Sequence, residues 1–313
     1  MRVLITGVTG FVGSHLVELL LKQGSYQIHG TSRSRDKLSA RAGLTMHLAD
    51  PLNLKEMVGL LRSIEPQWIF HLAGYAHNGR SFTEPELAWE GNLQVTQTLF
   101  SAVRYWGQKT RILITSSGLI YGDPETPGEV FDEKTSFRPA SPYAVSKAAA
   151  DLLGYQIWKE CGLEVIRARP FNQIGPGQNA EYAVANFARQ IAAIESGKQT
   201  PVLETGNLSG QRDLTDVRDM VYAFVRLMER GQPGEAYNCA TGMTYSMAEI
   251  LDRLIKLSSA QIEIRQKAES NRQSETLVSR TQVEKLKKST GWAPVHSLDS
   301  TLKDILNDWR SRN

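Results

Sequence analysis

Short apolar segments alternate with amphipathic segments along the first half of the chain. Residues 2–6 and 111–117 are rich in apolar side chains, as strands are when a parallel sheet buries both of its faces. Further strands are predicted at 26–31, 47–50, 68–74 and 236–239, and helices at 14–22, about 85–106 and 217–230. The alternation of strand and helix up to residue 170 predicts an α/β fold with a doubly wound parallel sheet, covered by helices on both faces.

The length of 313 residues suffices for one large domain or two modest ones. We expect residues 1–172 and about 212–240 to form the domain that contains the sheet. Residues of about 173–211 and 241–313 are expected to form a smaller C-terminal α/β lobe, with a cleft between the two units.

Composition excludes several classes of protein. A hydrophobic content of 41%, a charged content of 22% and a net charge of +3 are ordinary for a globular protein and give no reason to expect nucleic acid as a partner. Cys161 and Cys239 are far apart in apolar surroundings, so we expect buried thiols and a reducing, cytoplasmic location. No apolar run approaches the ~18 residues of a membrane span, and the first strand leaves no room for a signal peptide. We expect no metal site.

A glycine-rich turn connects the first strand to the first helix. Gly7, Gly10 and Gly13 are spaced so that backbone amides can approach a pyrophosphate at the start of the helix. The turn and the ends of the next strands predict a dinucleotide site. The residues expected to line it are Gly7, Thr9, Gly10, Phe11, Val12, Gly13, Leu72, Ala73 and Gly74, with Asp50 and Leu52 on the adenine side. Asn92 also belongs to this set, although a packing role in its helix is equally compatible with the sequence.

The end of the second strand indicates which dinucleotide is bound. NAD sites usually carry an acidic residue there, whereas this chain has Thr31-Ser-Arg-Ser-Arg35. Hydroxyl and guanidinium groups suit a 2′-phosphate, so Ser32 and Arg33 favour NADP(H) as the cofactor. The alternative is a solvated basic loop.

The stretch from Ser141 to Lys147 carries the candidate chemistry. Ser141 and Pro142 predict the start of a helix, on which Tyr143 and Lys147 lie one turn apart on the same face. A lysine ammonium near a phenol is expected to lower the phenol's pKa from its usual ~10 towards neutral pH. Ser117, at the end of a predicted strand, could hydrogen-bond the same substrate oxygen.

Three stretches resemble the extended short-chain dehydrogenase/reductase superfamily, whose members mostly act on nucleotide-activated sugars. They are Thr6-Gly-Val-Thr-Gly-Phe-Val-Gly13, Ser116-Ser117 with Tyr121-Gly122, and Tyr143-Ala-Val-Ser-Lys147, and the resemblance continues to Thr290-Gly-Trp-Ala-Pro294. The resemblance implies that Ser117, Tyr143 and Lys147 are the catalytic residues. Tyr143 would be the acid/base, Ser117 would polarise the sugar oxygen, and Lys147 would hold the nicotinamide ribose and tune Tyr143.

Polar clusters in the second half narrow the substrate. Arg212 and Arg272 suit a diphosphate, and Glu275 suits ribose hydroxyls, although surface solvation would also explain scattered arginines. The residues expected to bind the substrate are Ser117, Asn172, Gln178, Asn186, Arg212, Arg272 and Glu275. Pro-Phe-Asn-x-Ile-Gly-Pro-Gly-Gln and Arg-Asp-x-x-Asp-Val most resemble the GDP-mannose branch of the superfamily. This implies NADP(H)-dependent reduction of the C4 ketone of GDP-4-keto-6-deoxy-D-mannose to GDP-rhamnose or its C4 epimer.

One position separates the reductases of this branch from its dehydratases. The dehydratases carry a glutamate base two residues before the tyrosine that corresponds to Tyr121, and this chain has Leu119 there. A leucine cannot accept a proton, so reduction is favoured. Gln173 is a second departure, since relatives often have histidine. The alternatives are a GDP-mannose 4,6-dehydratase, a nucleotide-sugar C4 epimerase and, in another class, a non-catalytic NADP-binding regulator.

The resemblance also implies a homodimer or tetramer. In the superfamily, the helix that includes residues 143–160 commonly pairs two subunits. The apolar side chains of Leu152, Leu153, Ile157 and Trp158 fit that role and would equally serve an internal core.

Overall fold

A parallel seven-stranded sheet forms the centre of the larger lobe. The structure is a computed structural model that describes residues 1–34, 41–126, 128–267 and 280–313. In spatial order the strands are β11 (Ala236–Cys239), β7 (Glu164–Pro170), β5 (Arg111–Thr115), β4 (Trp68–His71), β1 (Arg2–Thr6), β2 (Gln27–Ser32) and β3 (Leu44–Leu48). All neighbours are parallel, which confirms the predicted doubly wound sheet. The order reverses between β1 and β4, and their carboxyl ends form the crevice where such sheets bind ligands.

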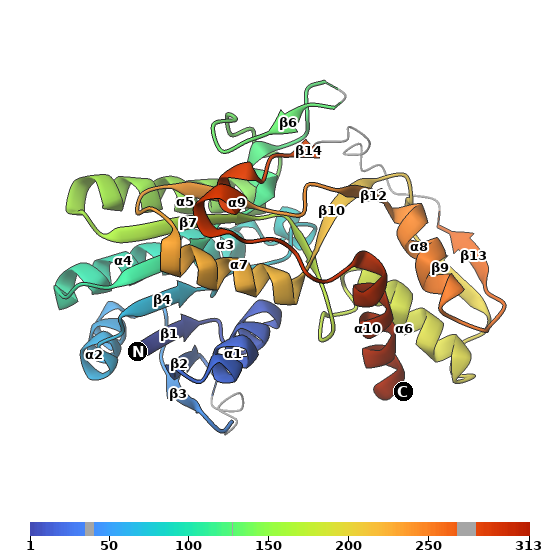
Figure 1. The fold of residues 1–313 in the computed structure, drawn as a ribbon, viewed down its shortest axis with the longest axis horizontal. Helices are drawn as coiled ribbons and strands as arrows, with labels where there is room; N and C mark the ends of the chain where they lie inside the picture. The colour runs from blue at the N-terminus through green and yellow to red at the C-terminus, as the bar shows by residue number, and fades with distance from the viewer. Residues whose placement is uncertain (35–40, 127, 268–279) are drawn as a thin grey trace.

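Alternating residues of the buried strands supply both faces of this sheet. Val3 and Ile5 pack in one core with α1 (Phe11–Gln23), α7 (Val217–Arg230) and α9 (Glu284–Thr290). Leu4, between them, packs in the core on the other face with α2 (Leu54–Ile64), α4 (Val95–Trp106) and α5 (Pro142–Cys161). Figure 1 shows α1 and α7 together on one side of the strands. The near-continuous apolar character of β1 follows from burial on both faces.

The helix predicted at 85–106 contains a π turn. It consists of α3 (Pro85–Trp89), the π-helical turn η3 (Glu90–Gln94) and α4, and the 3₁₀ helix η2 (Arg80–Phe82) precedes it. The π turn contains the buried Asn92. Single π turns often occur at functional sites, because they reorient a side chain without ending the helix.

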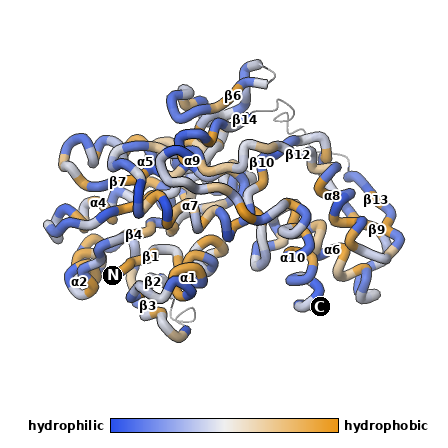
Figure 2. Tube along the Cα trace, viewed as in Figure 1, coloured by the Kyte–Doolittle hydropathy of each residue, from blue (hydrophilic) through white to orange (hydrophobic). Residues whose placement is uncertain are grey.

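The smaller lobe has its own core. It is built from β8 (Asn172–Ile174), α6 (Ala183–Glu195), β9 (Val202–Thr205), β10 (Gln211–Asp216), β12 (Thr244–Ser246), α8 (Met247–Lys256), β13 (Glu263–Gln266) and α10 (Leu298–Ser311). Ile191, Leu254 and Ile305 belong to this core and are fully buried. Figure 1 shows the lobe beyond one end of the large sheet, and Figure 2 shows apolar stretches on α1 and α2 in one lobe and on α6 in the other.

The chain crosses between the lobes at positions that differ from the expected boundaries. Strand β10 pairs with β8 and β12, and its Leu214 packs in the smaller core. Helix α9 and the following Trp292 pack in the larger core, where the indole nitrogen donates to the Asp219 carbonyl at 2.9 Å. The two short strands β6 (Val130–Phe131) and β14 (Arg280–Thr281) also pair near this helix. The expected division of the chain between the two lobes stays a proposal. It differs from these contacts in placing β10 with the larger lobe and α9 with the smaller one.

A buried ion cluster fixes α5 against the sheet. Both oxygens of the fully buried Asp151 accept hydrogen bonds from Arg169, and Arg167 Nη1 lies 2.5 Å from Oδ1. Both arginines pair with the same carboxylate, so their positive charges are compensated inside the protein. This cluster therefore holds α5 in position against the sheet.

Within the described part of the chain, no helix has both the length and the apolar character needed to cross a membrane. The same residues contain no group of three or more His, Cys, Asp or Glu arranged to hold a metal ion. Both cysteines are free thiols. Cys239 is buried as expected, whereas Cys161 at the end of α5 is partly exposed.

Candidate active site

The glycine-rich turn is packed too tightly for any side chain. Gly7 has a φ of 73°, and a Cβ there would lie 2.6 Å from the Ala73 nitrogen. A Cβ on Gly13 would lie 2.4 Å from the Gly7 carbonyl oxygen. Helix α1 begins at Phe11 after Gly10, which has no side chain with which to cap it. The first amides of α1 are thus left to an external anion at the carboxyl end of β1, and this cradle fits a pyrophosphate.

The ends of β2 and β3 lie next to this turn. Ser32 pairs in register with Leu48, and its hydroxyl donates to the Ser34 carbonyl at 3.0 Å. Arg33 is exposed, while Asp50 shapes the following turn by accepting from the Leu52 amide at 3.0 Å. These groups lie where an adenosine ribose would follow the pyrophosphate, and their contacts with a cofactor stay predictions. Arg35 lies outside the described residues.

Helix α5 brings Tyr143 and Lys147 to the carboxyl end of β5. Its start at Pro142 is confirmed, since the Ser141 hydroxyl caps the helix by accepting from the Ala144 amide at 3.1 Å. The buried Lys147 Nζ donates to the Thr115 carbonyl at 3.0 Å, and burial lowers the pKa of its ammonium to about 8. The lysine is therefore close to losing its charge near neutral pH.

We expected Lys147 to lower the pKa of the Tyr143 phenol, and this expectation is wrong. Burial raises the pKa of the Tyr143 phenol to about 12, and a hydrogen bond with Ser117 is what opposes the rise. The reason is that burial dominates the pKa of the phenol, while the Lys147 ammonium donates to the Thr115 carbonyl instead. Tyr143 is consequently a protonated acid that already contacts Ser117.

A buried hydrogen-bond chain underlies these groups. Thr96 donates its hydroxyl hydrogen to the Asn92 carbonyl at 2.6 Å, so it must accept from His71 Nε2 at 3.1 Å. His71 Nδ1 then accepts from Thr6 at 2.8 Å, which fixes the neutral tautomer. Burial, followed by the charge of Lys147, lowers the pKa of His71 to about 3. The chain joins the end of β1 to the π turn with an uncharged imidazole.

Asn92 extends this chain to the catalytic helix. Its Oδ1 accepts from the Tyr75 amide at 3.0 Å, and its Nδ2 donates to Ser146 Oγ at 2.9 Å. Ser146 in turn donates to the Tyr143 carbonyl at 2.8 Å. A Cβ on Gly74 would lie 2.7 Å from Asn92 Oδ1, so the loop after β4 passes directly over the amide. Of the two roles left open by the sequence, the geometry favours positioning.

Leu119 lies in the turn that follows Ser117. Ser117 Oγ caps the 3₁₀ helix η4 (Gly118–Tyr121) by accepting from the Leu119 amide at 3.1 Å. The Leu119 side chain is 43% exposed, whereas Tyr121 is buried and donates to Asn238 Oδ1 at 2.7 Å. Tyr121 is thus a structural residue, and position 119 is the member of this turn that is free to face a ligand.

The predicted substrate residues come from separate elements of the smaller lobe. Asn172 on β8 is exposed and donates to the Asp213 carbonyl at 3.3 Å, and Arg212 on β10 is exposed as well. Gln178 is buried and donates to the Gln173 carbonyl at 2.8 Å. Within the described residues the side-chain oxygens of both glutamines are buried without a hydrogen-bond partner, so each can accept from a ligand. Arg272 and Glu275 lie outside the described residues.

Asn186 lines a cavity of about 460 Å³ between the start of α6 and the end of β9. The residues that surround it are Ala183, Asn186, Phe187, Arg189, Gln190, Glu204, Thr205, Gly206, Asn207, Met247 and Lys267. Arg189 and Lys267 provide positive charge, and Glu204 pairs with Lys267 at 2.7 Å. The size and polar lining suit a nucleotide, and Asn186 is the predicted residue that the cavity contains.

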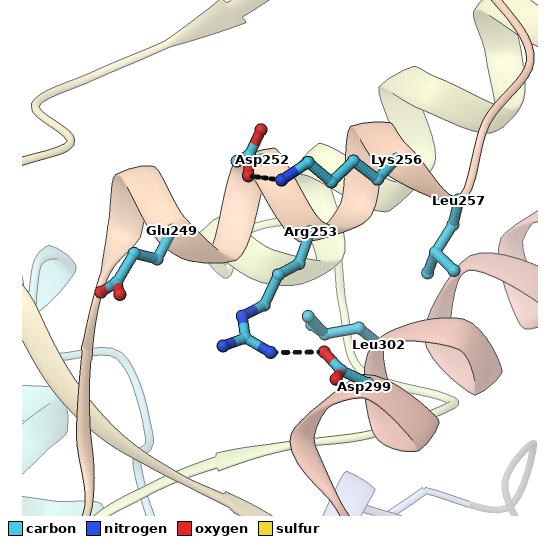
Figure 3. Close-up of a pocket in the computed structure, with 7 residues that line it drawn as sticks. All are labelled: Glu249, Asp252, Arg253, Lys256, Leu257, Asp299 and Leu302. Atoms are coloured by element: carbon cyan, nitrogen blue, oxygen red, sulfur yellow. Dashed lines mark hydrogen bonds and ion pairs between the residues drawn. The ribbon is translucent and has the colours of Figure 1, made fainter.

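A second cavity, of about 470 Å³, lies between α8 and α10. Figure 3 shows Lys256 paired with Asp252 and Arg253 paired with Asp299, with 2.6 Å between the charged atoms of each pair. Its helices carry none of the predicted site residues. We therefore assign the candidate site to the cavity around Asn186 together with Ser117, Tyr143 and Lys147.

Comparisons with known proteins show the family to which the chain belongs. The family model described as GDP-mannose 4,6 dehydratase matches residues 4–305. The chain belongs to this family. GDP-6-deoxy-D-mannose reductase of Pseudomonas aeruginosa is 33% identical over 99% of this chain and 98% of its own length. GDP-mannose 4,6-dehydratase of Sinorhizobium fredii is 30% identical over 80% of this chain and 74% of its own.

A solved structure has the same fold over the whole chain. RMD from Pseudomonas aeruginosa, complexed with NADPH, superimposes with a TM-score of 0.86 at 32% identity and covers 100% of both chains. The fold is therefore that of the extended short-chain dehydrogenases/reductases, as the resemblance implied. The relatives include both a reductase and a dehydratase by name.

Several residues of the site were missed by sequence reasoning. His71 and Ser146 belong to the hydrogen-bond chain between the sheet and α5, and Tyr182 donates from the smaller lobe to the Ala76 carbonyl in the loop after β4. Ser146 precedes Lys147 directly and could have been found from that position. His71 and Tyr182 gave no local signal, because their partners are distant in the sequence.

Proposed function

We propose that this protein reduces the C4 ketone of GDP-4-keto-6-deoxy-D-mannose with NADPH and yields GDP-rhamnose or its C4 epimer. The full-length similarity to GDP-6-deoxy-D-mannose reductase and the contact between Ser117 and Tyr143 support a reductase. Leu119 is the observation that carries the proposal. It is exposed in the turn after Ser117, where dehydration would need a base, and an alkyl side chain cannot remove a proton.

The cofactor cradle fits the proposed NADP(H). The Gly7–Gly13 turn would hold the pyrophosphate, Ser32 and Arg33 the 2′-phosphate, and Lys147 the nicotinamide ribose. Leu72, Ala73 and Gly74 would pass beneath it, because the Gly7 position already lies against Ala73. When bound, the nicotinamide supplies or accepts a hydride. The relative solved with NADPH supports the same choice of cofactor.

Tyr143 acts as the proton donor in this proposal. Its high pKa keeps the phenol protonated, so it can give its proton to the oxygen that develops at sugar C4. Ser117 hydrogen-bonds the same oxygen and stabilises the charge as it forms. The ammonium of Lys147 lies one helical turn away and favours the phenolate that is left behind. The hydrogen-bond chain through Asn92 and Ser146 keeps the donor in place.

A GDP-mannose 4,6-dehydratase is the second candidate, because the matching family model and one of the 30% identical relatives have that description. It would require a base other than position 119. A C4 epimerase and a non-catalytic NADP-binding regulator are less compatible with the site. The basic end of β2 does not favour NAD, and all three catalytic side chains are present.

A dimer and a cytoplasmic location complete the proposal. On α5, Leu152 is 56% exposed and Tyr155 is 43% exposed, which leaves an apolar face for a second copy. Leu153, Ile157 and Trp158 serve the internal core instead. The free thiols suit a reducing compartment.

Product analysis tests the proposal. The enzyme is incubated with GDP-4-keto-6-deoxymannose and NADPH, and the nucleotide sugar is identified by NMR. We expect a GDP-6-deoxyhexose with a new C4 hydroxyl, and coupling constants distinguish the rhamnose from the talose configuration. Recovery of unchanged keto sugar after prolonged incubation would contradict the proposal.

A further inference from the structure

Tyr182 joins the two lobes at the edge of the active site. It immediately precedes α6 in the smaller lobe, and its hydroxyl donates to the carbonyl of Ala76 at 3.2 Å. Ala76 belongs to the loop after β4 in the larger lobe, 106 positions earlier in the chain. The phenol therefore bridges the start of α6 in the smaller lobe and the loop that follows β4 in the larger lobe.

His77 stacks on the Tyr182 ring and is itself held by an acidic neighbour. The His77 ring stacks on the Tyr182 ring with centroids 5.7 Å apart and planes inclined by 21°. His77 Nδ1 lies 3.2 Å from Glu181 Oε2, and Arg80 Nη1 lies 3.5 Å from Glu181 Oε1. Glu181 thus holds His77 against the aromatic ring. A side chain constrained by a stack, a hydrogen bond and a paired neighbour has a defined orientation.

The segment after β4 that accepts from Tyr182 also contacts the start of α5. Ser81 Oγ accepts from the Tyr143 amide at 3.2 Å, and Ser141 Oγ donates to Asn78 Oδ1 at 2.5 Å. The influence of Tyr182, which raises the pKa of Tyr143, agrees with this placement. Burial, and then the carboxylate of Glu181, raises the pKa of Tyr182 itself. Tyr182 consequently remains a neutral hydroxyl at every pH at which the enzyme would work.

The hydrogen-bond inventory defines what this hydroxyl can do. A phenol has one hydroxyl hydrogen, and Tyr182 donates it to the Ala76 carbonyl. Towards a ligand, the Tyr182 oxygen can therefore act only as a hydrogen-bond acceptor. It can accept from a hydroxyl group and cannot protonate a ketone oxygen. A 4-keto-6-deoxyhexose bound with its C4 carbonyl at Tyr143 and Ser117 presents the hydroxyl of C3 beside it, whereas C5 carries the ring oxygen and the methyl group.

We propose that Tyr182 binds a sugar hydroxyl next to the reacting carbonyl, and that His77 and Glu181 are positioning residues for it. This inference rests on the proposed function, because it takes the ligand to be a hexose nucleotide. The smaller lobe then contributes directly to the geometry of the reaction as well as to nucleotide binding. The orientation of the sugar ring depends on a contact that lies outside Ser117, Tyr143 and Lys147.

Steady-state kinetics of Tyr182→Phe test the proposal. Phenylalanine keeps the ring stacked on His77 and removes the hydroxyl, and with it both the acceptor oxygen and the hydrogen bond to the Ala76 carbonyl. We expect kcat/KM for the keto sugar nucleotide to fall about tenfold, the loss of one hydrogen bond to a neutral group, with the Kd for NADPH unchanged. His77→Ala should lower kcat/KM similarly, and His77→Phe should recover part of the loss because it restores the stack. Tyr105→Phe is the matched control, since Tyr105 is 70% exposed on α4.

The outcomes separate this inference from the proposed function. If wild type turns over the keto sugar and Tyr182→Phe has wild-type kcat/KM, the inference is overturned. An equal loss of NADPH affinity and thermal stability in Tyr182→Phe would also overturn it, because the role would then be structural. If wild type is inactive, the proposed function fails, and calorimetric titration with GDP-mannose decides the inference alone: weaker binding in Tyr182→Phe supports it, and equal binding overturns it.

Discussion

The Asn92 amide nitrogen lies 2.9 Å from the Ser146 hydroxyl and connects the π turn to the helix that carries Tyr143 and Lys147. Ser146 passes this contact on by donating to the Tyr143 carbonyl. The other end of the Asn92 amide holds the Tyr75 backbone, so one side chain sets the distance between the loop after β4 and the catalytic helix. The arrangement explains why a polar residue is buried inside a helix.

Replacing Asn92 should therefore cost both stability and activity. Asn92→Ala leaves the Tyr75 amide and the Ser146 hydroxyl without their partner, which we expect to lower the free energy of unfolding by about 1–3 kcal/mol. The kcat should fall as well, because Tyr143 loses its fixed position. Chemical denaturation and steady-state kinetics measure the two effects. Gln94→Ala, at an exposed position of the same turn, is the control and should change neither.

The glycine turn offers a matched pair of substitutions. Gly13→Ala places a methyl group 2.4 Å from the Gly7 carbonyl and must displace the turn that holds the pyrophosphate. We expect the Kd for NADPH to rise about tenfold or more, equivalent to ~1.4 kcal/mol, as measured by fluorescence titration. Gly59→Ala on α2 meets nothing within 4 Å and should raise stability by roughly 0.5–1 kcal/mol with no change in Kd. An unchanged Kd in Gly13→Ala would show that the cofactor lies elsewhere.

The pKa of Lys147 predicts the pH dependence of turnover. Burial lowers it to about 8, so the ammonium loses its proton as the pH rises through that value. We expect kcat for ketone reduction to be constant below pH 8 and to decline above it, since a neutral lysine no longer favours the Tyr143 phenolate. Lys147→Arg retains the charge and should move the decline to higher pH. A profile that is identical in both proteins would refute a role for this charge.

The same pKa predicts an effect on stability. Between pH ~8 and its ordinary value of 10.5, Lys147 binds a proton in the unfolded chain and none in the folded one. The free energy of unfolding should therefore rise with pH through this window, and the cost of burying the charge should be fully present below it. Lys147→Met should lack this rise, which pH-dependent denaturation would show.

Local patterns predicted the elements of the sheet more accurately than the contacts of the site. The helix at 217–230 and the strand at 236–239 are confirmed to the residue as α7 and β11, because both have strong periodicity and clear ends. The π turn at Asn92 depends on packing against α5 and has no signature in a single sequence. The same holds for His71, whose partners Thr6 and Thr96 lie far along the chain in both directions.

Two further features of the site depend on the whole fold. The buried ion pair between Arg169 and Asp151 on α5 gave no local signal, because no sequence pattern links the two residues. The Tyr143 pKa was expected to fall because Lys147 is near in sequence. Burial decides its direction instead, and burial depends on the whole fold.

The consumption of NADPH with GDP-4-keto-6-deoxymannose, compared with the conversion of GDP-mannose in the presence of NADP, tests the central claim most directly. We predict that NADPH is oxidised with the keto sugar, that GDP-mannose is left unchanged, and that Tyr143→Phe loses most turnover while it still binds NADPH. Formation of a keto sugar from GDP-mannose would contradict the account, because it would show that Leu119 does not prevent dehydration.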